Sequence, residues 1–210
     1  MKTVNGRVAV VTGAASGIGF ALAQALAAEG ASVLMADIDG TAVDAAAAQV
    51  RVAGSEAVGI ELDVRDPDAV ERAGLEATER FGGLHIAVNN AGVVNGGTSW
   101  ELPLDAWHAV IDVNLWGVIH GIRAFVPRIL ETGSEGHVVN VASMASVTAL
   151  AGIGPYTVAK HGVGSVRRRT RRTRRGGLAR RRQRGVPRPR PLRHEPDRHG
   201  GTVDRRNERN

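Results

Sequence analysis

Short apolar runs alternate with longer helix-forming segments along the first 160 residues of the chain. Five of these runs are short enough to be strands covered on both faces, and they comprise residues 8–11, 32–36, 57–62, 86–89 and 137–141. The segments between them are expected to be helices: residues 17–28, 41–52, one that begins at Asp66-Pro67, and 104–130. This alternation predicts an α/β fold with a doubly wound parallel sheet.

The pattern changes at about Gly164. Residues 165–210 contain 18 arginines, 4 acidic residues and no Phe, Trp or Tyr. A segment so charged and so poor in apolar side chains cannot offset the entropy lost on ordering. We therefore expect one domain, residues 1–164, to be truncated after its fifth strand and to be followed by a disordered Arg-rich tail, residues 165–210.

The origin of this tail has two explanations. It is either a selected basic segment or the product of a frameshift near codon 164, because GC-rich coding sequence translated out of frame tends to give Arg, Pro and Gly. We favour the frameshift as a hypothesis. If the tail is genuine, its arginines in residues 167–175 could bind phosphate backbones without sequence preference, since no aromatic side chains stand among them.

Charge and cysteine content limit the kinds of site and the cellular compartment that are expected for the chain. The formal net charge of +6 combines 9 Lys and Arg against 17 Asp and Glu in residues 1–164 with an excess of 14 positive charges in the tail. There is no cysteine, which excludes disulfides and cysteine-ligated metals. We find no signal peptide and no run of 18 apolar residues, so we expect a cytoplasmic protein without a membrane partner.

A glycine-rich turn follows the first expected strand, with Gly13, Gly17 and Gly19. A pyrophosphate bound at the start of a helix needs close approach to backbone N–H groups, which glycine allows. Glycines alone fit a tight packing turn equally well, but the flanking strand and apolar helix favour a dinucleotide site. Asp37 follows the second strand, where it is either a turn residue or a ligand of the adenosine ribose. A carboxylate there would repel a 2′-phosphate, so NAD is expected rather than NADP.

Tyr156 and Lys160 are four residues apart and therefore share one face if the segment is helical. A phenol is a poor proton donor or base near neutrality, and a neighbouring ammonium favours the phenolate. Ser143 follows the fifth strand, at the edge where open α/β sheets bind ligands, and its hydroxyl could hold a substrate oxygen. Each feature is common by chance, so only their combination indicates a function.

In combination and order, these motifs resemble the short-chain dehydrogenase/reductase family over about residues 6–164. The resemblance implies a Rossmann-like, NAD(P)-binding domain that interconverts a secondary alcohol and a ketone by hydride transfer. It implies four catalytic residues: Asn114, Ser143, Tyr156 and Lys160. It also implies cofactor contacts from Tyr156, Lys160 and the residues Gly13, Ser16, Gly17, Ile18, Gly19, Asp37, Asp63, Val64, Asn90, Ala91 and Gly92.

The family pattern is not recognisable in residues 165–210, where the family would complete the sheet and cover the substrate. An alternative function is therefore a truncated, inactive cofactor-binding domain or a non-specific nucleic-acid binder, although we do not expect nucleic acid to be the main partner. Family members commonly pair through the long helix and the catalytic helix, and the interruption of the second leaves the oligomeric state open.

The histidines show no ligand spacing, so no metal site is expected, and His85 is expected to be an inconsequential surface residue.

Overall fold

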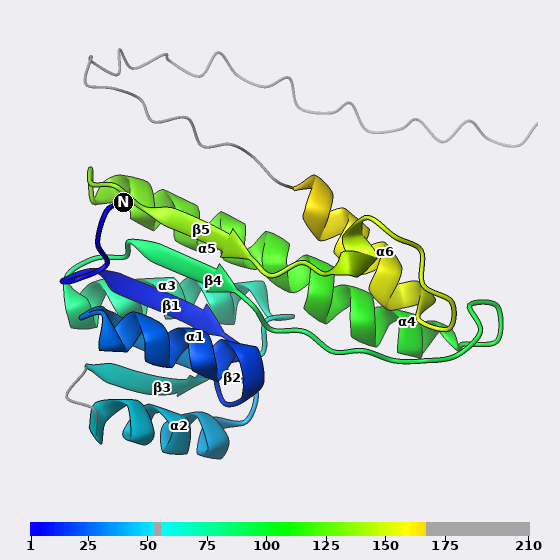
Figure 1. Cartoon of the computed structure of the whole chain (residues 1–210), viewed down its shortest axis with the longest axis horizontal. Helices are drawn as coiled ribbons and strands as arrows, with labels where there is room; N and C mark the ends of the chain where they lie inside the picture. Colours follow the sequence, from blue (N-terminus) through cyan, green and yellow to red (C-terminus); the bar gives the residue numbers. More distant parts are fainter. Residues whose placement is uncertain (53–55, 167–210) are drawn as a thin grey trace, which may run out of the picture. The chain divides into compact units, whose positions relative to one another are not determined.

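The computed structural model describes residues 1–52 and 56–166. Five parallel strands form one sheet with the order β3-β2-β1-β4-β5 (Figure 1). The strands are β1 (Val8–Thr12), β2 (Ser32–Asp37), β3 (Ala57–Glu61), β4 (Ile86–Asn89) and β5 (His137–Asn140). The predicted doubly wound parallel sheet is confirmed, because the chain adds β2 and β3 on one side of β1 and then returns to add β4 and β5 on the other. Of the predicted tail, residues 165–210, Ser165 is the last residue of a helix that begins at Gly154, and residues 167–210 lie outside the described residues.

Helices cover both faces of this sheet (Figure 1). On one face lie α1 (Gly17–Ala28) and α2 (Gly40–Val52), and on the other lie α3 (Pro67–Phe81) and α5 (Gly117–Glu131). Two further helices, α4 (Leu104–Ile111) and α6 (Gly154–Ser165), pack against each other beyond the carboxyl ends of the strands.

Alternating side chains of the strands build two separate cores. In β1, Ala9 and Val11 pack on the side of α1 and α2, whereas Val8 and Val10 pack on the side of α3 and α5. Every residue of β1 is buried, as expected for the central strand of a sheet covered on both faces. At the edge of the described sheet, Val139 of β5 is 43 % exposed.

The ends of the helices follow local signals. Asp66 caps α3 as predicted, since its Oδ1 accepts from the N–H groups of Asp68 at 2.9 Å and Ala69 at 3.2 Å. Helix α1 has the predicted bounds; its C-cap is Glu29, and Gly30, at φ +84°, is the left-handed residue that follows.

The long helix predicted over residues 104–130 is wrong in one respect. A π-helical turn, Asp112–Trp116, separates α4 from α5. Single π turns insert one extra residue into a helix and often occur at functional sites. Here the turn contains Asn114, which is fully buried and bonded to a neighbouring loop.

The same helix bears on the expectation that the chain has no membrane span. Taken as one 28-residue unit with a mean hydropathy of 1.3, Leu104–Glu131 is long and apolar enough to cross a membrane by length and composition alone. However, its α5 part packs against α3 and β4. A helix in the core of an α/β domain passes the same test, so this finding is weak support for a membrane span.

Candidate active site

A cavity of about 920 Å³ opens at the carboxyl ends of the strands and is lined by residues that follow all five of them. This is the edge at which open α/β sheets bind ligands, and the volume lies within the range of small-molecule sites. All the predicted site residues line the cavity except Asn114 and Ser143. Sequence reasoning did not predict that it would also be lined by Ile38, Leu62, Arg65, Val93, Val94, Ala109, Val113, Val141 and Ala142.

The glycine-rich turn can exist only without side chains at key positions. Gly13 and Gly17 have φ values of +66° and +55°, in the left-handed region. A Cβ on Gly19 would overlap the Gly13 carbonyl oxygen, and one on Gly13 would lie 2.8 Å from the Cα of Ala91. Ser16, the N-cap of α1, makes no capping hydrogen bond through its side chain. The first N–H groups of α1 therefore reach the cavity wall without a side-chain cap, and such a helix end attracts anions.

Thr12 is a structural residue of the site that sequence reasoning missed. Its Oγ1 accepts from the N–H groups of Asn90 at 3.0 Å and Ala91 at 3.1 Å. In return, the Asn90 side-chain amide donates to the carbonyl oxygens of Thr12 at 2.9 Å and Gly13 at 3.0 Å. These bonds fix the loop after β4 to the glycine-rich turn. The available signal was a polar side chain at the end of a wholly buried strand.

Asp37 makes a turn contact and also lines the cavity. Its Oδ2 accepts from the N–H of Ala15 at 3.0 Å, and its Oδ1 accepts from the N–H of Asp39 at 3.3 Å. The carboxylate thus ties the end of β2 to the glycine-rich turn. The turn role and the ribose-binding role, left as alternatives by the sequence, are compatible in this geometry.

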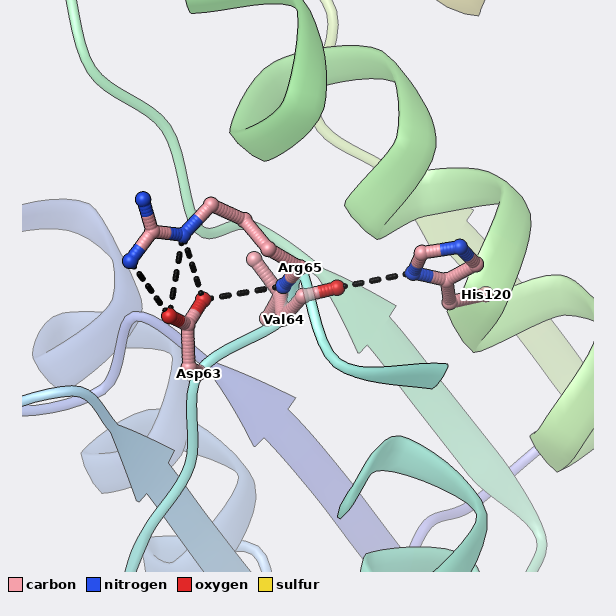
Figure 2. A network of polar contacts seen from close by, with 4 residues as sticks. All are labelled: Asp63, Val64, Arg65 and His120. Atoms are coloured by element: carbon pink, nitrogen blue, oxygen red, sulfur yellow. Dashed lines mark hydrogen bonds and ion pairs between the residues drawn. The ribbon is translucent and has the colours of Figure 1, made fainter. Parts of the chain in front are cut away.

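The loop after β3 carries a side-on ion pair between Asp63 and Arg65 (Figure 2). The Arg65 Nε donates to the two carboxylate oxygens at 3.0 and 2.9 Å, and Nη2 donates to Oδ2 at 2.6 Å. The hydrogen bonds from Arg65 lower the pKa of Asp63, and those to Asp63 raise the pKa of Arg65. Nearby, the Nδ1 of His120 in α5 contacts the carbonyl oxygen of Val64 at 2.9 Å, which tethers the loop a second time (Figure 2).

Tyr156 and Lys160 share one face of α6 and both line the cavity. The Lys160 Nζ lies 5.6 Å from the centroid of the Tyr156 ring. Lys160 is only 4 % exposed, and its Nζ donates to the carbonyl oxygen of Val141 at 2.8 Å. Burial lowers the pKa of this lysine below its ordinary value.

The other two predicted catalytic side chains lie outside the cavity lining. Asn114 is fully buried; its Oδ1 accepts from the N–H of Val93 and its Nδ2 donates to the Val93 carbonyl, both at 2.7 Å. Ser143 caps the short 3₁₀ turn Met144–Ser146, and its Oγ accepts from the N–H of Ala145 at 3.2 Å. Both residues hold loops in place here, and their catalytic roles stay predictions.

The expectation for His85 was wrong. Its Nδ1 accepts from the N–H of Val8 at 3.2 Å, so the imidazole completes the pairing at the beginning of β1. Burial, followed by the positive charge of Arg7, lowers the pKa of His85. Only the neutral ring with its proton on Nε2 can accept this hydrogen bond.

Comparison with known proteins places the chain in a family. The pattern that defines the short chain dehydrogenases matches residues 7–175. The chain belongs to the short-chain dehydrogenase family. It is 45 % identical over 155 residues to 1-deoxy-11-beta-hydroxypentalenate dehydrogenase of Streptomyces avermitilis, covering 73 % of this chain and 57 % of that protein. It is 39 % identical over 160 residues to cyclohexanol dehydrogenase of Acinetobacter sp., covering 76 % and 63 %.

Solved structures agree with this assignment. A short-chain dehydrogenase/reductase of Burkholderia phymatum in complex with NAD superposes with a TM-score of 0.77 at 39 % identity, covering 79 % of this chain and 59 % of that one. Carveol dehydrogenase of Mycobacterium avium in complex with NAD gives a TM-score of 0.75 at 34 % identity, covering 79 % and 65 %. The chain thus spans little more than half of the length of the hydroxypentalenate dehydrogenase, and less than two thirds of the length of the cyclohexanol dehydrogenase.

Proposed function

We propose that residues 1–164 form the cofactor-binding domain of an NAD-linked oxidoreductase that interconverts a secondary alcohol and a ketone. The observation that carries this proposal is the placement of Tyr156 and Lys160 in the wall of the same cavity as the uncapped beginning of α1. The names of the relatives, which include cyclohexanol dehydrogenase and carveol dehydrogenase, support an alcohol or a carbonyl compound as the substrate.

The residues present fit a dinucleotide. The glycine-rich turn (Gly13, Ser16, Gly17, Ile18 and Gly19) would hold the pyrophosphate, since no side chain caps α1 there. Asp37 would bind the adenosine ribose and disfavour a 2′-phosphate, so we expect NAD rather than NADP. Asp63 and Val64 would contact the adenine, while Asn90, Ala91 and Gly92 would line the path to the nicotinamide.

A bound nicotinamide supplies the acceptor or donor of the hydride. In the oxidation, the Tyr156 Oη removes the proton of the substrate hydroxyl, and in the reduction it returns that proton. Lys160 lies beside the ring, with its Nζ 5.6 Å from the ring centroid, and its ammonium can also donate to a ribose hydroxyl. The Ser143 hydroxyl keeps its own proton free to donate to the substrate oxygen, because its Oγ only accepts in the turn contact.

Asn114 is proposed to support the same site from its buried position, by holding the loop that contains Val93. Its side chain holds Val93 from both sides and lies close to Gly92, where an added Cβ would come within 3.1 Å of its Oδ1. The π turn that contains it interrupts the regular helical bonding of this segment. We propose that this interruption lets the Asn114 region hold a proton-relay water behind Lys160.

The competing proposal is that the chain does not catalyse a reaction: it would be a truncated domain that binds the cofactor weakly, or a nucleic-acid binder through the arginines in residues 167–175. Two measurements separate these functions. Absorbance of NADH is followed with a panel of secondary alcohols and ketones, and retention on nucleic acid is compared at two salt concentrations before and after removal of residues 165–210. Turnover supports the enzyme. Retention that is lost with the tail and with added salt supports the nucleic-acid binder.

A further inference from the structure

Arg65 lies at the same end of the cavity as Asp37. Strands β2 and β3 are paired in register up to Asp37 and Glu61, and the N–H of Leu62 donates to the Asp37 carbonyl oxygen at 2.7 Å. The loop that begins at Leu62 therefore starts directly beside the end of β2. Both Arg65 and Asp37 line the cavity.

The guanidinium of Arg65 is held in a defined orientation. Its Nε and Nη2 are both directed at Asp63, while half of the side chain (49 %) stays exposed. Among the described residues, the other N–H groups of the guanidinium have no hydrogen-bond partner. The contact of His120 with the Val64 carbonyl fixes the backbone one residue earlier (Figure 2). The ion pair with Asp63 therefore restricts the Arg65 side chain and fixes the orientation of its guanidinium plane. Less side-chain entropy is then lost when a ligand packs on that plane.

The surroundings suit a flat aromatic ring. Ile38, which is 60 % exposed, Leu62 and Val113 line the same cavity and offer apolar contact area. Because Asp63 neutralises the charge of Arg65, the guanidinium is poorly suited to bind a second anion. What it offers a ligand is its planar face. Guanidinium planes stack on aromatic rings, including nucleic acid bases.

We propose that Arg65 binds the adenine base of the cofactor, with the guanidinium plane, held by Asp63, packed against the ring. This inference rests on the proposed function, because it presumes a dinucleotide in the cavity. Asp63 and Val64 are already proposed to contact the adenine. Arg65 would be a third contact, which makes the adenosine half of the cofactor bind more tightly.

The test is binding of NADH, ADP-ribose and reduced nicotinamide mononucleotide to the full chain by titration calorimetry. Arg65→Ala should weaken NADH and ADP-ribose by about 5- to 30-fold, as expected when a planar group stacked on a base is lost, and leave the mononucleotide unchanged. Arg65→Lys keeps the charge but loses the plane, so it should weaken both adenine ligands by a similar factor. It also provides the test if the alanine variant fails to fold.

Arg80→Ala is the matched control. Arg80 is also half exposed (52 %) and paired with a carboxylate, Glu76, but it lies in the last turn of α3 and does not line the cavity. Its removal should leave all three affinities unchanged. The proposal is overturned if Arg65→Lys binds NADH as the wild type does, or if the substitution weakens the mononucleotide as much as NADH. Failure of the wild type to bind either NADH or ADP-ribose would overturn the proposed function as well.

Discussion

Gly17 offers a way to separate the cost of backbone strain from the loss of cofactor binding. Its φ is +55°, and a Cβ added there would meet no atom within 4 Å. Gly17→Ala therefore creates no clash, and its cost is the left-handed backbone of a residue with a side chain, about 1–2 kcal/mol. The lower entropy of the unfolded variant opposes this cost by about 0.4–1 kcal/mol. We expect a decrease in melting temperature of about 2–4 °C for each kcal/mol.

The effect on binding should be larger than strain alone explains. Gly17 lines the cavity where the first N–H groups of α1 reach it, and a methyl group there would keep a pyrophosphate from these donors. Loss of one hydrogen bond to a charged group, about 1.5 kcal/mol or more, weakens NADH binding at least about tenfold. The measurements are thermal unfolding and NADH calorimetry.

Gly82→Ala is the control for this experiment. Gly82 follows α3 with φ +81°, has equally open space around an added Cβ, and does not line the cavity. It should show a similar loss of stability with unchanged NADH affinity. Equal NADH affinities for the two variants would refute the assignment of the helix N-terminus as the pyrophosphate site.

Two further predictions concern stability. Phe125 is fully buried between α5 and the sheet, so Phe125→Ala should lower the free energy of unfolding in urea by about 3–5 kcal/mol, and a loss below about 1 kcal/mol would contradict this packing. Because the pKa of His85 is lowered in the folded chain, the unfolded chain takes up a proton at this residue at a higher pH than the folded chain does. Stability should therefore be fully present above the unfolded pKa of about 6.5 and fall as the pH decreases below it. His85→Asn, which can still accept from Val8, should reduce that slope; an unchanged slope would assign it to other groups.

The features that the sequence predicts well are those set by neighbouring residues. The apolar run of β1 and the Asp66-Pro67 start of α3 are local patterns, and the structure has both where they were expected. The shared face of Tyr156 and Lys160 follows from helical spacing alone. The alternation of strands and helices then leaves few topologies, which is why the parallel sheet was predictable.

The features that were missed depend on contacts between segments far apart in the chain. Arg65 lines the cavity because β3 lies beside β2, and His85 matters because its ring reaches the beginning of β1. The π turn at Asn114 accompanies a contact with Val93, 21 residues earlier, which no helical periodicity encodes. Thr12 is a connecting residue only because β4 is its neighbour in the sheet. Such contacts become visible only when the register of the sheet is known.

Whether the Tyr156 hydroxyl moves the proton is tested by turnover of the Tyr156→Phe variant, measured beside its NADH affinity. Phenylalanine keeps the ring against Lys160 and removes only the hydroxyl that would move the proton. We predict that NADH formation from a secondary alcohol falls by at least about 100-fold, the contribution of a general acid or base, while NADH affinity is unchanged. Wild-type turnover in this variant, or an equal loss of turnover and NADH binding, would show that Tyr156 is not the general acid and base of the reaction.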